Sequence, residues 1–211
     1  MGQPADSSRR TLHNMPTSER ELVQRLQSGD EAAFVEVVDA FHPRLLRFAA
    51  GLVGSWQAAE DVVQDTWLAV IRGVERFEGR SSLQTWLFQI CANRARSTWG
   101  REQRAVPMDL SGPTVDPHRF GAERQWVEPP APWDAIDDRL YADAMLPLVR
   151  GAIDDLPELQ RQVVTLRDVE GLTSKDVCAV LSISEANQRV LLHRGRARVR
   201  GALEQKMAGD A

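Results

Sequence analysis

The sequence predicts an all-α protein made of two small helical domains joined by a long linker. Apolar residues recur at helical spacing from Glu19 to Arg104 and from Leu140 to Met207, and neither segment has the alternation typical of a strand. Between them, Val106 to Asp138 is acidic, rich in proline and without periodicity. We therefore expect a disordered tail over 1–16, a first domain over 17–104, a linker over 105–138 and a second domain over 139–207.

Apolar spacing and cap residues place the individual helices. In the first domain we expect helices over Glu19–Gln27, Glu31–Leu52, Gln57–Arg76 and Leu83–Trp99. In the second domain we expect them over Leu146–Leu156, Pro157–Val169, Ser174–Leu181 and Glu185–Met207. Because an internal proline loses a backbone hydrogen bond, Pro147 is expected to break or start its helix. The capping-box pattern predicts Ser18, Ser81 and Thr173 as helix caps.

Composition excludes several classes of protein. The chain is 43% hydrophobic and 27% charged, within the globular range, and its net charge of -4 excludes a uniformly basic nucleic-acid binder. No apolar run approaches the roughly 18 to 20 residues that span a bilayer, and residues 1–16 have no signal-peptide core, so we expect a cytoplasmic protein without membrane insertion. Cys91 and Cys178 lie in helical apolar patterns and are expected to be buried thiols.

Residues 171–185 predict a helix-turn-helix. A short capped helix directs Val177, Val180 and Leu181 inward, three residues interrupt it, and Ser184 can cap a longer second helix. One side of that second helix carries a basic stripe of Arg189, His193, Arg196 and Arg200. Guanidinium groups in such a stripe suit the phosphates and guanines of a DNA major groove. The alternative is that the arginines only solvate the outer face of a terminal helix.

Two features of the first domain carry further chemistry. In the segment 59–72, an inward stripe leaves a mixed acidic and apolar surface on the other side of the helix, formed by Asp61, Gln64, Asp65, Leu68 and Arg72. After it, a polar loop containing Gly79 leads into a capped helix whose Leu83, Leu87, Ile90 and Cys91 can face the core. Arginine and amide side chains on this helix suit a nucleic-acid backbone and unpaired bases. For Trp86 and Trp99 we expect packing rather than base stacking.

These segments together resemble the extracytoplasmic-function sigma factors of bacterial RNA polymerase, over about Glu19 to Arg104 and Leu140 to Leu203. The resemblance implies a promoter-recognition subunit with core polymerase (beta and beta-prime subunits), promoter DNA and an anti-sigma factor as partners, and with no catalytic residue, metal or cofactor. The implied polymerase-binding residues are Asp61, Gln64, Asp65, Trp67 and Leu68. For the -10 element they are Gly79, Arg80, Ser81, Ser82, Asn93, Arg94 and Arg96. For the -35 element they are Arg189, Val190, His193 and Arg194. Gln188 departs from the family, which has a buried valine there.

Three other functions compete with this one. A helix-turn-helix repressor or activator that works without polymerase would need a symmetric dimer, and the sequence has no evident dimerisation segment. An enzyme is disfavoured because the four histidines are scattered and there is no phosphate loop, nucleophile elbow or metal-spaced cluster. The third is a sigma-like decoy for an anti-sigma factor. The linker, in turn, either threads through the polymerase cleft or is a plain solvated tether.

Overall fold

The computed structural model of the protein describes residues 17–99 and 139–209. The expected tail over 1–16 and linker over 105–138 lie outside these residues. Within the described ranges every regular element is a helix and there is no strand, which confirms the all-α prediction. The described part also contains no helix that is long and apolar enough to cross a membrane.

The helices follow the predicted order. They are α2 (Thr17–Gln27), α3 (Glu31–Val53), α4 (Trp56–Gly73), the short 3-10 helix η1 (Val74–Arg76), α5 (Leu83–Trp99), α6 (Arg139–Asp154), α7 (Glu158–Val164), the π-helical turn η4 (Thr165–Val169), α8 (Ser174–Leu181) and α9 (Glu185–Gly209). Their contacts divide into two compact units. The first comprises 17–99 together with Leu172–Ile183, and the second comprises the described parts of 106–171 and 184–211.

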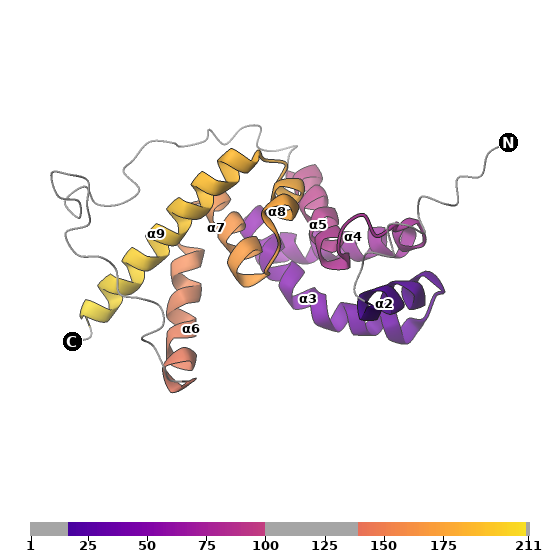
Figure 1. Ribbon diagram of the computed structural model, residues 1–211, viewed down its shortest axis with the longest axis horizontal. Helices are drawn as coiled ribbons and strands as arrows, with labels where there is room; N and C mark the ends of the chain where they lie inside the picture. Colours follow the sequence, from indigo (N-terminus) through magenta and orange to yellow (C-terminus); the bar gives the residue numbers. More distant parts are fainter. Residues whose placement is uncertain (1–16, 100–138, 210–211) are drawn as a thin grey trace. The chain divides into compact units, whose positions relative to one another are not determined.

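Helices α3, α4 and α5 form the core of the first unit (Figure 1). Asp30 caps α3 through the backbone N–H groups of Ala32 and Ala33, and Gly54, in the left-handed region at φ +71°, ends it. The rings of Phe48 and Phe88 meet edge to face with centroids 5.2 Å apart. The largest fully buried side chains of this core are Val23, Val37, Leu45, Val53, Val62, Val63, Val70, Leu87 and Phe88.

Cys91 belongs to the same core. Burial raises the pKa of its thiol to about 12, against a smaller opposing effect of the Thr66 hydroxyl, so the sulfur stays protonated at neutral pH. This confirms the predicted buried thiol. Cys178 in α8 is only partly buried.

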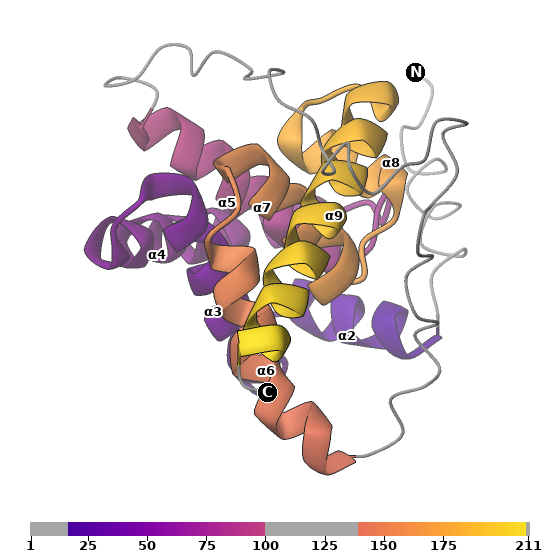
Figure 2. The same ribbon diagram turned by 90° about the vertical axis from the view of Figure 1, so that its left-hand side faces the viewer.

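The second unit is built on α9, along which α6 and α7 pack (Figure 2). The contact with α7 is close at Gly195: a Cβ atom added there would lie 2.6 Å from Cγ2 of Val164 and 3.5 Å from the carbonyl oxygen of Gln160. Only a residue without a side chain therefore allows the two helices to approach to this distance.

Four details differ from the sequence-based expectations. Helix α6 begins at Arg139 and continues through Pro147, as α3 continues through Pro43, because packing against neighbouring helices holds the turn despite the lost backbone bond. Ser82 rather than Ser81 accepts the N–H of Thr85 at the start of α5. The predicted helices over Gln57–Arg76 and Pro157–Val169 each end in a different helical form, η1 and η4. Ser18 lies inside α2, which begins one residue earlier.

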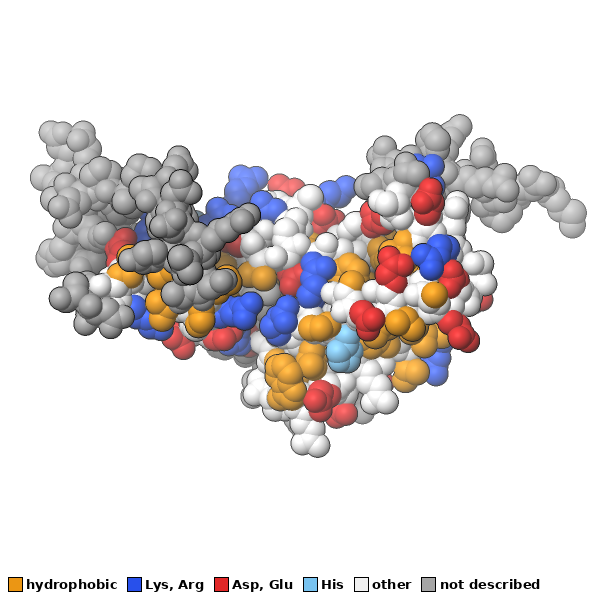
Figure 3. Space-filling model, turned by 90° about the horizontal axis from the view of Figure 1, so that it is seen from below, with side chains coloured by type: hydrophobic (Ala, Val, Ile, Leu, Met, Phe, Trp, Pro, Cys, Tyr) orange, Lys and Arg blue, Asp and Glu red, His pale blue; other side chains and the backbone are white. Residues whose placement is uncertain are grey.

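Some large hydrophobic side chains remain at the surface. On the face drawn in Figure 3, hydrophobic side chains stand beside acidic and basic ones. Among the described residues the large exposed ones are Val35, Trp56, Leu68, Ile71, Leu146, Val169, Val190 and Met207. Single exposed apolar residues are common in proteins. Only those that share a helix face with other candidate functional residues therefore indicate a binding surface.

Replacement of Gly195 by alanine is expected to destabilise the second unit by about 1–3 kcal/mol, because the new methyl group would overlap Val164. The matched control is Gly201→Ala on the same helix, where nothing lies within 4 Å of the added Cβ, and it is expected to gain up to about 1 kcal/mol of helix propensity. Urea unfolding followed by far-ultraviolet circular dichroism compares the two. Equal effects would contradict the close approach of α7 and α9.

Candidate functional site

The mixed acidic and apolar surface lies on α4 as expected. Asp61, Gln64, Asp65 and Leu68 are all exposed, whereas the intervening side chains, among them Val62, Val63, Thr66 and Val70, are buried. Leu68 keeps 45% of its area accessible, although a leucine side chain gains about 1.5–3 kcal/mol on full burial. An apolar side chain held outward on the same face as Asp61 and Asp65 fits a protein docking surface.

Trp67 lies on the inner side of this helix. It is 9% exposed, its ring meets Phe34 edge to face at 5.9 Å, and its Nε1 donates to Nδ1 of His42 at 3.2 Å. The indole therefore packs α4 against α3, and Trp67 belongs to the inward side of the helix rather than to its exposed surface. It supports the surface from beneath by fixing the rotation of α4.

The loop over Phe77–Ser82, here called the 77–82 loop, joins η1 to α5. Gly79 is buried and adopts the left-handed conformation at φ +68°, which a side chain would strain. Arg80 is 80% exposed by its side chain and pairs with Glu78 at 3.1 Å. Ser81 is partly buried, and its hydroxyl donates to the carbonyl oxygen of Ser82 at 3.3 Å. The loop thus presents hydroxyls and one guanidinium beside the first turn of α5.

Phe77, the first residue of this loop, packs against Trp86 of α5. Phe77 is buried, and the two rings are 4.9 Å apart in a tilted arrangement. Trp86 is therefore a packing residue, as predicted, and it also lies 3.4 Å from the position of a Cβ on Gly73. The side chain of Trp99 lies outside the described part.

The candidate DNA-binding residues on α5 are exposed, and two of them already form hydrogen bonds within the protein. Arg96 donates to Oδ1 of Asn93 at 2.6 Å and to the carbonyl oxygen of Val180 in α8, in the same unit, at 3.1 Å. Partial burial lowers the pKa of the Arg96 guanidinium, which nevertheless stays charged at neutral pH. Arg94 is exposed on the same turn. Asn93 and Arg96 form a hydrogen-bonded polar pair, and a DNA ligand would have to displace the Arg96 contacts.

The helix-turn-helix has the expected local structure. Thr173 caps α8 by accepting the N–H of Asp176 at 3.2 Å, and Val177, Val180 and Leu181 are buried. Ser182 closes the helix in the left-handed region at φ +57°. Ser184 then accepts the N–H of Asn187 at 3.2 Å, which makes it the cap of α9.

On α9, the predicted -35 residues point outward to different degrees. Arg189 and His193 are exposed, Val190 keeps 43% of its area accessible, and Arg194 is half-buried. Within the part of the chain that the structure describes, Arg189 forms an exposed ion pair with Glu185, one turn before it, at 3.4 Å, and such pairs contribute little. The basic surface is therefore available to an anionic ligand.

Arg196 behaves differently from the rest of the predicted arginine stripe. Its Nε and Nη2 atoms bind both carboxylate oxygens of Asp168 in η4, at 2.9 and 2.5 Å. This bidentate ion pair raises the pKa of the Arg196 guanidinium and holds the side chain against η4. The expectation that Arg196 faces DNA is thus replaced by a role inside the second unit.

Gln188, the position where the family has valine, is almost fully buried at 1% exposure. Neither its amide nitrogen nor its amide oxygen has a hydrogen-bond partner among the described residues, and the same holds for the amide oxygen of buried Gln160. Leaving such groups without partners costs stability. The burial of this amide confirms that position 188 lies on the inward-facing side of α9.

Sequence reasoning missed two residues at these surfaces. Ile71 is 53% exposed and lies seven residues after Gln64 and three after Leu68, so helical spacing alone could have added it to the α4 surface. Glu78 was missed because its ion pair with Arg80 depends on the turn at Gly79. No cluster of three or more His, Cys, Asp or Glu that could hold a metal exists in the ranges 17–99 and 139–209.

Comparison with known families gives two separate matches along the chain. Residues 37–105 match the family described as Sigma-70 region 2, and residues 147–199 match Sigma-70, region 4. The two matches together cover more than half of the chain. The protein belongs to the sigma-70 family. It is a sigma factor of the extracytoplasmic-function type, which binds core RNA polymerase and directs it to promoter DNA for initiation.

Curated relatives of the sigma factor are similar over nearly their whole length. The ECF RNA polymerase sigma-E factor of Haemophilus influenzae is 25% identical over 90% of this chain and 97% of its own. The RNA polymerase sigma-H factor of Pseudomonas aeruginosa is 28% identical over 88% of this chain and 94% of its own.

Two solved structures share the fold. CnrH, in complex with the cytosolic domain of CnrY, superposes with a TM-score of 0.55 at 22% identity, covering 90% of this chain and 99% of CnrH. The sigma factor RpoE of Bartonella quintana, in complex with the anti-sigma factor NepR, has a TM-score of 0.52 at 25% identity, covering 81% of this chain and 96% of its own.

Proposed function

We propose that this sigma factor works through three separate surfaces. The exposed face of α4, with Asp61, Gln64, Asp65 and Leu68, binds the beta-prime subunit of core polymerase, while Trp67 holds that face in place. The observation that carries the proposal is that Leu68 and Ile71 are exposed on the same helix as the exposed Asp61 and Asp65, while the other side of that helix is buried.

The second surface receives the -10 element. The 77–82 loop supplies Gly79, Arg80, Ser81 and Ser82 to hold a base extruded from the melted strand. Asn93, Arg94 and Arg96 on α5 bind neighbouring bases or phosphates. Binding of the unpaired base offsets the few kcal/mol lost in unstacking it. Promoter opening therefore needs no catalytic group from this chain, and we propose that it has no enzymatic activity of its own.

The third surface reads the -35 element through Arg189, Val190, His193 and Arg194 of α9. Capping by Ser184 places these side chains in the first turns of α9, the part of a recognition helix that enters a major groove. Arginine can bind guanine through two hydrogen bonds, and the exposed Val190 can contact a thymine methyl group.

We further propose cytoplasmic action, since core polymerase works there, and control by an anti-sigma factor. The latter rests on the Bartonella quintana relative, whose structure is that of a complex with an anti-sigma factor. The domain boundaries at 17–104 and 139–207 also remain predictions, because the contacts group Leu172–Ile183 with the first unit.

Run-off transcription tests the function directly. Purified chain, core polymerase and fragmented genomic DNA are expected to give discrete transcripts that core polymerase alone does not produce. The free chain is expected to bind the same promoters poorly, since its net charge is -4. Tight operator binding without polymerase would favour an independent regulator, and absence of start-site selection would favour a decoy.

Reversal of both carboxylates, Asp61→Arg with Asp65→Arg, is expected to weaken association with core polymerase at least about a hundredfold, because like charges would face each other at the interface. The matched control reverses two exposed carboxylates of other helices, Glu21→Arg with Asp39→Arg, and should keep most of the affinity. Fluorescence anisotropy with labelled chain measures both. Thermal melting confirms that each variant is folded, and unchanged affinity of the first variant would refute the α4 assignment.

The double variant Arg189→Ala, Arg194→Ala is expected to bind a -35 duplex in the holoenzyme about tenfold or more weakly, because each base contact contributes about 1–3 kcal/mol. Its affinity for core polymerase should not change. Arg150→Ala, which removes an exposed arginine of α6, serves as control and should alter DNA binding less than twofold. A mobility-shift series with mutated -35 sequences provides the measurement; an equal loss from Arg150→Ala would contradict a specific role for α9.

A further inference from the structure

Helix α2 lies outside the region 2 match, which begins at residue 37. The last residue of α2 nevertheless contacts the start of the 77–82 loop. Nε2 of Gln27 donates to the carbonyl oxygens of Phe77 at 2.9 Å and of Val74 at 3.2 Å. One amide group thus binds both the first residue of η1 and the first residue of the loop. These bonds are partly buried, and they join residues about fifty positions apart in the sequence.

The same helix also binds the end of the loop. Oε1 of Glu19 accepts the backbone N–H of Leu83, the first residue of α5, at 2.6 Å. The first N–H groups of a helix have no partner within it and carry partial positive charge, so a carboxylate is well suited to this position. Ser82 satisfies the N–H of Thr85 at 3.1 Å, and Glu19 therefore completes the cap of α5 from a distant helix.

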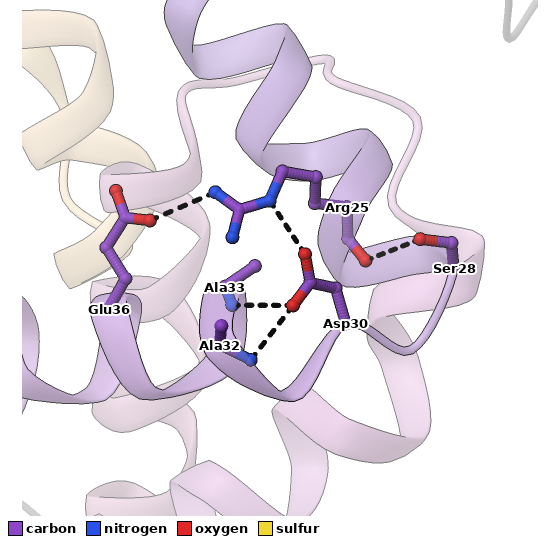
Figure 4. A network of polar contacts seen from close by, with 6 residues as sticks. All are labelled: Arg25, Ser28, Asp30, Ala32, Ala33 and Glu36. Carbon is purple, nitrogen blue, oxygen red and sulfur yellow. Dashed lines mark hydrogen bonds and ion pairs between the residues drawn. The ribbon is translucent and has the colours of Figure 1, made fainter.

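Helix α2 is itself fixed to α3 by a network of polar contacts (Figure 4). Arg25 bridges Oδ2 of Asp30 at 2.8 Å and Oε2 of Glu36 at 3.2 Å. The hydrogen bond from Arg25, together with the backbone N–H of Ala33, holds the pKa of Asp30 below its ordinary value. Asp30 is also the cap of α3, so one carboxylate joins the end of α2 to the start of the next helix.

Buried side chains complete this attachment. Val23 and Leu26 of α2 are 0% and 5% exposed, which places the side of the helix between Glu19 and Gln27 against the core. Gln27 follows Glu19 by eight positions in the helix, a rise of roughly 12 Å. The helix can therefore act as a rigid spacer between two points on the loop.

We propose that α2 clamps the 77–82 loop, and that Glu19 and Gln27 are positioning residues for capture of the -10 base. The inference rests on the proposed role of this loop. Among the described residues, the side-chain contacts that join one loop residue to another are the exposed Glu78–Arg80 pair and the hydrogen bond from the Ser81 hydroxyl to the carbonyl oxygen of Ser82. A site that must order itself on binding loses affinity, whereas a loop already held at both ends does not.

Four variants of the full chain test the clamp: Glu19→Ala, Glu19→Gln, Gln27→Ala and, as control, Gln24→Ala, which truncates an exposed glutamine of the same helix. Hydrogen exchange should become about fivefold faster at residues 78–83 in Glu19→Ala and Gln27→Ala, the size expected for one lost helix cap. Glu19→Gln keeps an oxygen that can accept the N–H of Leu83 and should retain most of the protection. Gln24→Ala should match the wild type.

The functional measurement uses holoenzyme reconstituted with core polymerase and a promoter fragment carrying 2-aminopurine in the -10 element. Glu19→Ala and Gln27→Ala should bind the opened strand about fivefold more weakly, with unchanged affinity for core polymerase and with rescue by Glu19→Gln. A merely structural loss would instead lower the affinity for core polymerase as well.

The outcomes separate the two proposals. Unchanged hydrogen exchange in both alanine variants overturns the clamp. Faster exchange with unchanged strand binding overturns the positioning role. A wild-type holoenzyme that opens no promoter overturns the proposed function, and with it the positioning role, whatever the exchange rates are.

Discussion

Burial of one side of α4 against its neighbours is the constraint on which the first unit depends. Val62, Val63, Val70 and the indole of Trp67 are removed from water there, each contributing on the order of 1.5–3 kcal/mol. Because an α-helix repeats every 3.6 residues, burial of this side forces Asp61, Gln64, Asp65 and Leu68 outward. The packing that stabilises the unit is thus also what arranges its candidate polymerase surface.

In the second unit, the rotation of α9 has a comparable role. Gly195 lets α9 approach Val164 of α7, and Leu191 and Gln188 are buried on the same side. Asp168 adds a bidentate ion pair with Arg196. With those groups turned inward, Arg189, Val190 and His193 are left for solvent or DNA. The amide of Gln188, which has no hydrogen-bond partner among the described residues, lowers the stability of this arrangement, since a valine at position 188 would leave no polar group unsatisfied.

The 77–82 loop, the proposed base-binding segment, depends on residues far away in the chain. Its two ends bind Gln27 and Glu19 of α2, and α2 is in turn held by the Arg25–Asp30–Glu36 network on α3. The loop conformation is therefore set by a helix that contributes nothing to the proposed base pocket itself. Such support is common where a ligand has to be met by a pre-ordered site.

The sequence by itself determined the all-α class, the helix order, the inward stripe of α4, and the caps Thr173 and Ser184, because periodicity and capping are local properties. Only the tertiary structure decided that α6 runs through Pro147, that Ser82 and Glu19 share the cap of α5, and that Arg196 turns to Asp168. Each of these depends on a partner from another helix. Contacts between residues 28 to 64 positions apart, such as Arg196 with Asp168 and Leu83 with Glu19, leave no periodic signal in the sequence.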